Sequence, residues 1–428
     1  MSNRWSPHPR YRLYTSFASY LPSSSGLDGA TERFEAGVCR KFNAAAAVCV
    51  PRARTGLYFA LSDMIKTKRK VIMSPLTIVD VVNAVLLAGG IPVFADICRS
   101  SCSIDPEQAE SLIDSQTVAI LLTHLHGQTA GARVFREICD RHGIRLIEDA
   151  AQAFGAVENG QHLGTIGDAG IYSFGFFKNL STWRGGMVVS NDQEFITRLR
   201  NRVHKLPRIS RSRIARTALA GLLVDLGTWP PFFSQVTHRI IRSSPKSFER
   251  RLDPERRASR LKDFPESYWH RMREWQACLG LAQLHRVDSD TNARLAHARR
   301  YHEALDGVPQ FVKPERTDDR SNIYTYFPIQ VRDRNTLVST AQKRGRDFGV
   351  QHLRNCADLS EFAELYRDCP NARAAASELV LLPTYPRYPA REVELNIEVV
   401  REFASIISES IRNEHDTVRD RFRSARGA

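Results

Sequence analysis

Apolar and polar positions follow two alternating periods between Val71 and Val189, with turn residues where one period gives way to the other. Thr77 to Gly90 has the apolar spacing of a helix and ends on two glycines, which favour a helix stop. Ile91 to Ile97, which follows, has the composition of a strand. Repeated alternation of helix and strand is typical of a mainly parallel sheet covered by helices, so we expect an α/β fold.

Further elements of this region can be assigned from their end signals. Asp105 has the side chain of a helix N-cap, and Pro106 stands at the first helical position, where proline costs least. A strand, a helix and two more strands are expected at Val118 to Leu122, Gly131 to Gly143, Ile144 to Ala150 and Ala169 to Phe174. Because ligands collect beyond the carboxyl ends of strands in such sheets, Glu148 and Asp149 mark the expected site, as does the histidine loop at 123–128.

The chain is long enough for more than one domain. Its 428 residues exceed what a single hydrophobic core usually spans. After a basic segment, a helical pattern resumes near Tyr268, and the strand-like Asn322 to Val331 precedes a last helix near Glu392 to Asn413. The expected division is an N-terminal extension (1–33), a large domain (34–204), a basic and partly apolar insert (205–262), an interdomain helix with a smaller C-terminal α+β domain (263–414), and a fraying polar tail (415–428).

Composition is that of an ordinary soluble protein, with 42% hydrophobic and 25% charged residues. The formal net charge of +14 is concentrated, because the segment from Asn201 to Lys262 holds 15 lysines and arginines against four acids and so accounts for +11. Such a segment favours an anionic partner or surface. No nucleic-acid reader module is recognisable, so nucleic acid is not an expected partner.

Two interpretations of the insert at 205–262 stay open. In one, arginines beside its apolar positions seat it at a membrane surface, where it meets anionic lipid or a lipid-linked sugar. Those apolar positions are Leu222, Leu223, Val224, Trp229, Phe232 and Phe233. In the other, it is a helical elaboration whose apolar side packs on the body of the same dimer. A membrane-spanning helix is not expected, because the apolar run is shorter than the roughly 20 residues required and contains Asp225 and two prolines.

Cysteine usage and the start of the chain indicate a compartment. The eight cysteines are scattered without a paired CxxC spacing, and no apolar leader opens the sequence. We therefore expect free thiols and a cytoplasmic protein, with at most a peripheral contact at the inner face of the membrane. Cys98 and Cys102 come nearest to half a metal site, and no second close pair follows them, so no metal is expected.

One lysine interrupts an apolar and aromatic stretch after a predicted strand. A lysine amine becomes nucleophilic in a dry pocket or beside a cation, and the Gly-Phe-Phe flank of Lys178 would help to form such a pocket. A Schiff-base lysine of this kind binds pyridoxal phosphate, which accepts electrons only if a buried carboxylate keeps its ring nitrogen protonated. Asp149, at a strand end, is the candidate acid. Each residue also has a simpler interpretation, as a surface lysine and as the cap of a helix begun by AAQAFG.

The sequence resembles the DegT family of sugar aminotransferases in four blocks that occur in the family's order. They are VIMSPLTIVDVVNAVLLAGGIPVFADI, IEDAAQAFGA, GDAGIYSFGFFKNLSTWRGGMVVSND and RMREWQACLGLAQLHRVD, and the resemblance runs from about Phe34 to Ala404 without the insert. It implies the aspartate-aminotransferase type of fold, with a mainly parallel seven-stranded sheet in the large domain. It also implies pyridoxal 5'-phosphate as cofactor and a homodimer whose active sites are shared across the interface.

The resemblance implies roles for residues around the cofactor ring. Lys178 in FFKNL would hold the cofactor as a Schiff base and move protons during the reaction. Asp149 in EDAAQ would pair with the pyridinium nitrogen, and Gln152 would contact the 3-hydroxyl face.

The phosphate end is expected to use a helix start, and here the sequence departs from the family. Ser173 in YSF would hold the phosphate, together with backbone N–H groups around Arg54 and Thr55 and the charge of Arg54. Ile78 stands where members commonly stack an aromatic ring on the pyridine. Glu274 stands where an asparagine often reaches the partner subunit's phosphate, and a carboxylate there would repel it.

The substrate side is expected to include His126, which replaces a frequent tyrosine, together with Arg184 and His352. Arg271 is a further candidate cation for a pyrophosphate. Because some relatives with histidine at the Schiff-base position are dehydratases, Lys178 favours transamination. The expected reaction moves an amino group from glutamate or glutamine to a keto-sugar, nucleotide-linked, for polysaccharide or a glycosylated metabolite. The alternatives are a cyclitol or other ketone as acceptor, and a catalytically silent member acting as a membrane or pathway binding protein.

Overall fold

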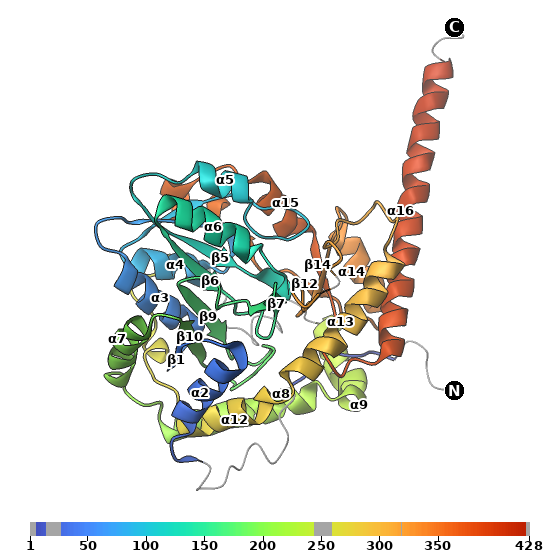
Figure 1. Ribbon diagram of the computed structural model, residues 1–428. Coiled ribbons are helices and arrows are strands. Elements are labelled where there is room, and N and C mark those ends of the chain that lie inside the picture. The colour runs from blue at the N-terminus through green and yellow to red at the C-terminus, as the bar shows by residue number, and fades with distance from the viewer. Residues whose placement is uncertain (1–5, 14–26, 244–258, 318, 425–428) are drawn as a thin grey trace.

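The computed structural model describes residues 6–13, 27–243, 259–317 and 319–424. They form a large lobe around a central sheet and a small lobe beside it, and α12 (Glu274–Leu284) and α13 (Val287–Ala304) lead from one to the other (Figure 1). The parts of the expected N-terminal extension and insert at 14–26 and 244–258 lie outside the described residues.

The central sheet has seven strands in the order β1-β10-β9-β6-β5-β2-β4. Only β10 runs antiparallel to its neighbours, so the expectation of a mainly parallel seven-stranded sheet is confirmed. The strands are β1 (Ala46–Val50), β2 (Lys70–Met73), β4 (Ile91–Phe94), β5 (Thr117–Thr123), β6 (Arg145–Asp149), β9 (Ala169–Ser173) and β10 (Gly186–Ser190).

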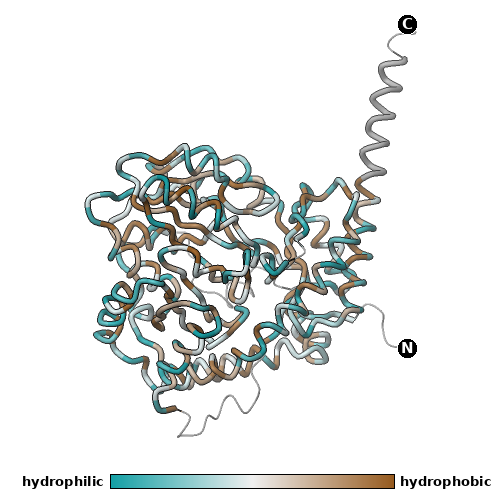
Figure 2. The backbone as a smooth tube through the Cα atoms, viewed as in Figure 1, coloured by the Kyte–Doolittle hydropathy of each residue, from teal (hydrophilic) through white to brown (hydrophobic). Residues whose placement is uncertain are grey.

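Both faces of this sheet are buried, because successive strand residues point into different cores. In β5, Ala119 and Leu121 join one hydrophobic cluster, whereas Ile120 and Leu122 join the other. Figure 2 shows hydrophobic positions gathered at the centre of the large lobe, where the sheet lies. The covering helices include α2 (Ala30–Phe42), α3 (Ala53–Met64), α4 (Val79–Leu87), α5 (Pro106–Ser111), α6 (Ala132–His142) and α7 (Gln193–His204).

The small lobe is built on a three-stranded antiparallel sheet with its own core. Its strands are β11 (Phe327–Gln330), β14 (Leu379–Leu382) and β12 (Gly349–Val350), and the helices α13, α14 (Arg334–Lys343) and α16 (Ala390–Ser424) pack beside them. A short strand pair, β3 (Leu76–Thr77) with β13 (Arg354–Asn355), and α15 (Pro370–Glu378) link this part of the chain to the large lobe. The helix α16 continues through much of the expected tail, to Ser424.

The described part of the insert folds as a run of helices. They are α8 (Arg211–Gly227), α9 (Pro230–Phe232), a π-helical turn (Phe233–Thr237) and α10 (His238–Ser243). The buried residues of α8 are Thr217 and Gly221, and Gly221 rests on the Trp183 ring. No helix among the described residues combines the length and the apolar character that a bilayer crossing requires.

The opposite side of α8 carries an exposed leucine stripe at Leu219, Leu222, Leu223 and Leu226, with exposures from 40% to 61%. The spacing of i, i+3, i+4 and i+7 places these leucines on one helix face, about half a turn from Thr217 and Gly221. The apolar side of α8 therefore does not pack on the body of its own subunit. Trp229 extends the exposed surface, but Phe233 is buried and does not contribute to it.

Residues 6–13, called the N-terminal strap below, lie along the small lobe. His8 forms a parallel bridge with Arg346, and the backbone N–H of Arg10 donates to the Asp347 carboxylate over 3.2 Å. At the other end of the strap, the Tyr11 ring lies 3.9 Å from the ring of Phe177 in the large lobe. The strap therefore contacts both lobes.

Candidate active site

Lys178 lies in a loop that leaves the carboxyl end of β9. Its backbone N–H donates to the carbonyl of Gly175 over 3.3 Å, which closes the turn that carries it. The side chain is half-buried and lines a cavity whose apolar wall includes Phe176 and Phe177. The loop thus presents the amine to an enclosed and partly apolar space, as a nucleophilic lysine requires.

Asp149 ends β6 within electrostatic range of that lysine. Burial raises the pKa of the Asp149 carboxyl, while the Ala151 N–H and the charge of Lys178 lower it in turn. Asp149 Oδ1 accepts the Ala151 N–H over 3.1 Å, and the residues that follow form turns. The interpretation of Asp149 as a helix cap is therefore wrong.

Glu148, its neighbour in the chain, has a structural role. Its fully buried carboxylate accepts the backbone N–H groups of Gly164, Ile166 and Gly167 over 2.6 to 2.8 Å. It also lies 2.9 Å from Nε2 of His124, whose Nδ1 accepts the N–H of Ala130, so Nε2 carries the hydrogen and donates. Of the two acids at this strand end, Asp149 is the one left to face a ligand.

Gln152 connects the acidic strand end with the lysine loop. Its side-chain oxygen accepts the N–H of His126 over 2.9 Å, and its carbonyl accepts the Thr325 hydroxyl over 2.6 Å. The Asn179 amide donates to the same carbonyl over 3.4 Å, next to Lys178. These bonds keep Gln152 beside the lysine loop, and none of them uses its amide NH₂.

Ser173 and the start of α3 are brought together by a glycine. In the sheet, Ser173 pairs with Gly186, and a Cβ on Gly186 would lie 2.6 Å from the backbone nitrogen of Ala53, the first residue of α3. The N-cap residue Arg52 makes no side-chain capping bond to the helix. The first N–H groups of α3 therefore point at the strand end near Ser173 as a helix N-terminus suited to a dianion.

The side chains of Arg54 and Thr55 are engaged within the protein. Arg54 Nη1 pairs with Asp80 and also contacts the Tyr268 hydroxyl, which itself donates to Asp80 over 2.9 Å. The buried Thr55 hydroxyl donates to the Tyr268 carbonyl over 3.0 Å. Because Asp80 balances the charge of Arg54, the helix backbone is the stronger anion-binding element here.

The two departures from the family pattern have local explanations. Glu274 Oε2 accepts the N–H and the hydroxyl of Thr31 over 2.8 and 3.0 Å, at the start of α2, whose N-cap Gly29 offers no side chain. The carboxylate thus holds two elements of its own subunit together. Ile78 is the N-cap of α4 and packs, half-buried, against the core on that side of the sheet.

The expected substrate residues do not gather around the Lys178 cavity. His126 is 1% exposed, its Nε2 lies 3.1 Å from the Gln351 amide, and burial lowers its pKa to about 3. Its side chain is buried and does not line that cavity, and its contact with the substrate stays a prediction. His352 is exposed, and Arg184 is half-buried. Neither lines that cavity.

Sequence reasoning missed most of the cavity wall. Besides the lysine loop, the lining comes from the N-terminal strap, from α12 and α13, and from the small lobe: Arg10, Tyr11, Arg12, Leu13, Gln283, Arg294, Thr325, Tyr326 and Tyr385. These residues carry no motif of their own and are remote from Lys178 in the chain. Asp149, Gln152 and Ser173 do not line this cavity and approach the lysine loop from the strand ends.

The arrangement fits pyridoxal phosphate on three observations. The half-buried Asp149 carboxyl has a raised pKa, and a cationic ring nitrogen beside it would favour its ionised form. An amine lies within electrostatic range of it, at Lys178. An uncapped helix start meets a serine at the adjacent strand end, as the phosphate requires.

Comparison with known proteins places these residues in a family context. The family model described as DegT/DnrJ/EryC1/StrS aminotransferase family matches residues 18–223 and 242–401, which is most of the chain. The spore coat polysaccharide biosynthesis protein SpsC of Bacillus subtilis (strain 168) is 28% identical over 384 residues, covering 87% of this chain and 88% of that protein. The GDP-perosamine synthase of Vibrio cholerae is 29% identical over 285 residues, covering 66% of this chain and 65% of the synthase.

Solved structures agree on the fold. The crystal structure of the sugar aminotransferase CalS13 from Micromonospora echinospora superposes with a TM-score of 0.71 and covers 92% of this chain and 99% of its own. At 22% identity this likeness establishes the shared architecture.

Proposed function

Because the chain belongs to the DegT/DnrJ/EryC1/StrS aminotransferase family, we propose that it moves an amino group from glutamate or glutamine to a nucleotide-linked keto-sugar. The family depends on pyridoxal phosphate, and the chain is an aminotransferase. The observation that carries the proposal is the half-buried Asp149 at the end of β6, within electrostatic range of Lys178. The names of two relatives, which refer to polysaccharide biosynthesis and to perosamine, support a sugar acceptor in polysaccharide or glycosylated-metabolite synthesis.

Each residue of the site has a stated task in this proposal. Pyridoxal phosphate supplies an electron sink for the bonds at the substrate carbon. The Lys178 amine would hold the cofactor at its aldehyde carbon and would move a proton to and from the substrate carbon in both halves of the reaction. The Asp149 carboxylate would keep the ring nitrogen protonated, and Gln152 would contact the 3-hydroxyl face. Ser173 and the first N–H groups of α3 would hold the phosphate.

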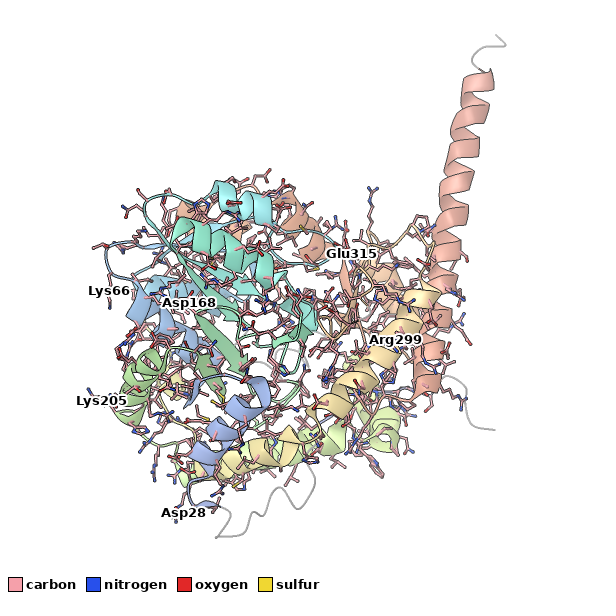
Figure 3. The ribbon with its side chains drawn as sticks, viewed as in Figure 1. Asp28, Lys66, Asp168, Lys205, Arg299 and Glu315 are labelled. Carbon is pink, nitrogen blue, oxygen red and sulfur yellow. The ribbon has the colours of Figure 1, made fainter. Side chains whose placement is uncertain are left out.

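Spectroscopy of lysine variants tests this assignment. Wild-type protein loaded with cofactor should show the visible absorbance of a lysine-bound pyridoxal phosphate, and Lys178→Ala should lose it. Lys205→Ala is the matched control and should keep this absorbance, because Lys205 is an exposed lysine directly after α7 (Figure 3). Unchanged visible absorbance in Lys178→Ala would refute the role of Lys178.

The acceptor class needs a separate measurement. Wild-type protein should lose its visible absorbance with L-glutamate or L-glutamine and regain it with one member of a panel of nucleotide-linked keto-sugars. Recovery with a cyclitol ketone alone would replace the proposed acceptor while leaving the amino transfer intact. Failure of every amino donor would instead favour a silent binding protein.

A homodimer with shared active sites is the second part of the proposal. The chain mass is 48.4 kDa, so light scattering should give about twice that value in solution. A monomer mass at micromolar concentration with full activity would contradict it.

We also propose that a cytoplasmic dimer meets the inner membrane surface through the insert. The support is the exposed leucine stripe of α8 together with Arg211, Arg213 and Arg216 of the same helix. Triple substitution of Leu222, Leu223 and Leu226 by serine should abolish sedimentation with anionic vesicles, whereas neutral vesicles should bind neither protein. If the triple substitution instead changed the mass of the protein in solution and left vesicle binding unaltered, the leucine stripe would be a contact with a second subunit.

A further inference from the structure

The cavity beside Lys178 has one wall that the family match does not include. Arg10, Tyr11, Arg12 and Leu13 of the N-terminal strap line it, and the family match begins at residue 18. This wall therefore lies outside the residues that the family model matches.

The strap is held in a defined position. The buried Arg346 donates from Nη2 to the carbonyl of Ser6 over 2.6 Å, and Arg10 donates from its backbone to Asp347 over 3.2 Å. Leu13, at the other end, is 4% exposed. A segment fixed at both ends can present a side chain to the cavity with a small loss of conformational entropy on binding.

Only one cation of the strap is left for the cavity. Arg10 is occupied, because its Nη1 lies 3.5 Å from Asp347 Oδ1 and donates to the Phe348 carbonyl over 3.1 Å. Burial lowers the pKa of His8 to about 4 and raises the pKa of Tyr11 to about 12, so both are neutral near pH 7. Arg12 contributes a guanidinium, and its buried Nε has no hydrogen-bond partner among the described residues.

A second guanidinium shares the cavity. Arg294 of α13 is 7% exposed, and its Nη1 donates to the Thr325 carbonyl over 3.2 Å. Arg12, Arg294 and Lys178 therefore surround one space that is walled in part by phenylalanines. Arginine is suited to bidentate binding of carboxylate or phosphate, so two guanidiniums that line one space suit an oxyanion.

We propose that Arg12, with Arg294, binds an oxyanion of the substrate and so determines specificity. The inference rests on the proposed function, because it requires the substrate amine or ketone to react beside Lys178. The oxyanion is either the carboxylate of the amino donor or a phosphate of the nucleotide-linked acceptor. Both are planar or tetrahedral oxygen groups of the kind that a guanidinium binds.

Calorimetric binding with two probes tests the proposal and separates the two sources. Glutarate represents the donor carboxylates, and uridine diphosphate represents the acceptor phosphates. With cofactor-loaded protein, Arg12→Gln should weaken one probe about tenfold or more, because a charge-assisted bond is lost. Arg12→Lys, which keeps the charge but loses the bidentate geometry, should weaken the same probe less than Arg12→Gln does. Arg299→Gln, at an exposed arginine of α13 (Figure 3), should equal wild type.

The outcomes are distinct. Weaker glutarate binding assigns the site to the donor, and weaker uridine diphosphate binding assigns it to the acceptor. Equal affinities of Arg12→Gln and wild type for both probes overturn the proposal, as does a wild-type protein that binds neither. Loss of visible absorbance with saturating L-glutamate reports on amino transfer independently, so a failure of the proposed function is seen separately. Melting temperatures of all variants check that each has folded.

Discussion

The two adjacent acids at the end of β6 have different roles, structural for Glu148 and chemical for Asp149. Glu148 accepts three backbone N–H groups and a histidine N–H, whereas Asp149 has one backbone donor and the charge of Lys178 nearby. Substitution of either acid should therefore have a different signature.

Asp149→Asn should bind the cofactor and slow its reaction. An amide cannot keep the ring nitrogen protonated, so we expect the rate of absorbance loss with L-glutamate to fall roughly a hundredfold. Stopped-flow absorbance measures this, with the melting temperature as control. A wild-type rate in Asp149→Asn would show that the nitrogen has another partner.

Glu148→Gln should lower stability instead. Its amide nitrogen would face donors that need an acceptor, which costs about 3 kcal/mol for a fully buried group. Denaturant unfolding measures the free energy. A loss below about 1 kcal/mol would mean that the loop at 164–167 rearranges around the amide.

Buried histidines make stability depend on pH. Burial lowers the pKa of His126 from 6.5 to about 3. Between these two values the unfolded chain binds a proton at His126 and the folded chain does not. The stability is complete above about pH 6.5 and is lost as pH falls from there, by up to about 1.4 kcal/mol per pH unit for this one group. Urea titrations of wild type and His126→Gln between pH 7 and 4.5 should diverge with this slope. Parallel curves would show that His126 does not contribute to the pH dependence of stability. The other histidines are the same in both proteins, so their contribution cancels in the difference between the two curves.

At the scale of elements, the approach of β10 to α3 depends on Gly186. A methyl group there would lie 2.6 Å from the Ala53 nitrogen and 2.7 Å from the Tyr172 carbonyl, both backbone atoms. Gly186→Ala should push the helix start away from the strand end, weaken cofactor binding and cost about 1–3 kcal/mol. Gly227→Ala is the control, since its Cβ would meet only Thr237 Oγ1 at 3.8 Å. Equilibrium dialysis of the cofactor and thermal melts measure both, and unchanged cofactor affinity in Gly186→Ala would count against the phosphate assignment.

Elements with local signals were predictable from the sequence, and those fixed by distant contacts were not. The Asp105 cap is confirmed by a 3.1 Å bond from the Gln108 N–H, because capping needs only neighbouring residues. The partner of Glu274, by contrast, is Thr31, which lies 243 positions away. Its carboxylate was interpreted as a repulsive group because nothing near it in the chain reveals the α2 start.

The candidate site shows the same division. Lys178 and Asp149 stand at strand ends that periodicity reveals, and the sheet brings them together. The position of His126 suggested a substrate contact, yet its φ of 58° turns it into the interior beside Gln351. Arg12 carries no pattern at all, since its place in the cavity depends on how the strap crosses the small lobe.

For the whole molecule, thiol chemistry should be suppressed while the fold persists. None of the eight cysteines, all of which lie in the described residues, forms a disulfide, and burial is the main cause of a raised pKa in each. Since the thiolate is the reactive form, iodoacetamide at pH 7.5 should label native protein slowly and label all eight sites after denaturation. Intact-mass spectrometry counts the adducts. Rapid labelling of the native protein would indicate local opening around the labelled residue.

The strap also determines what a relative movement of the two lobes would involve. It is bonded to Asp347 on the small lobe, and its Tyr11 ring touches Phe177 beside the reactive lysine. A hinge rotation would have to carry the strap along or separate that ring pair. A fluorinated tyrosine at position 11 would therefore report each opening as a change of its nuclear magnetic resonance shift, in real time and without a coloured substrate.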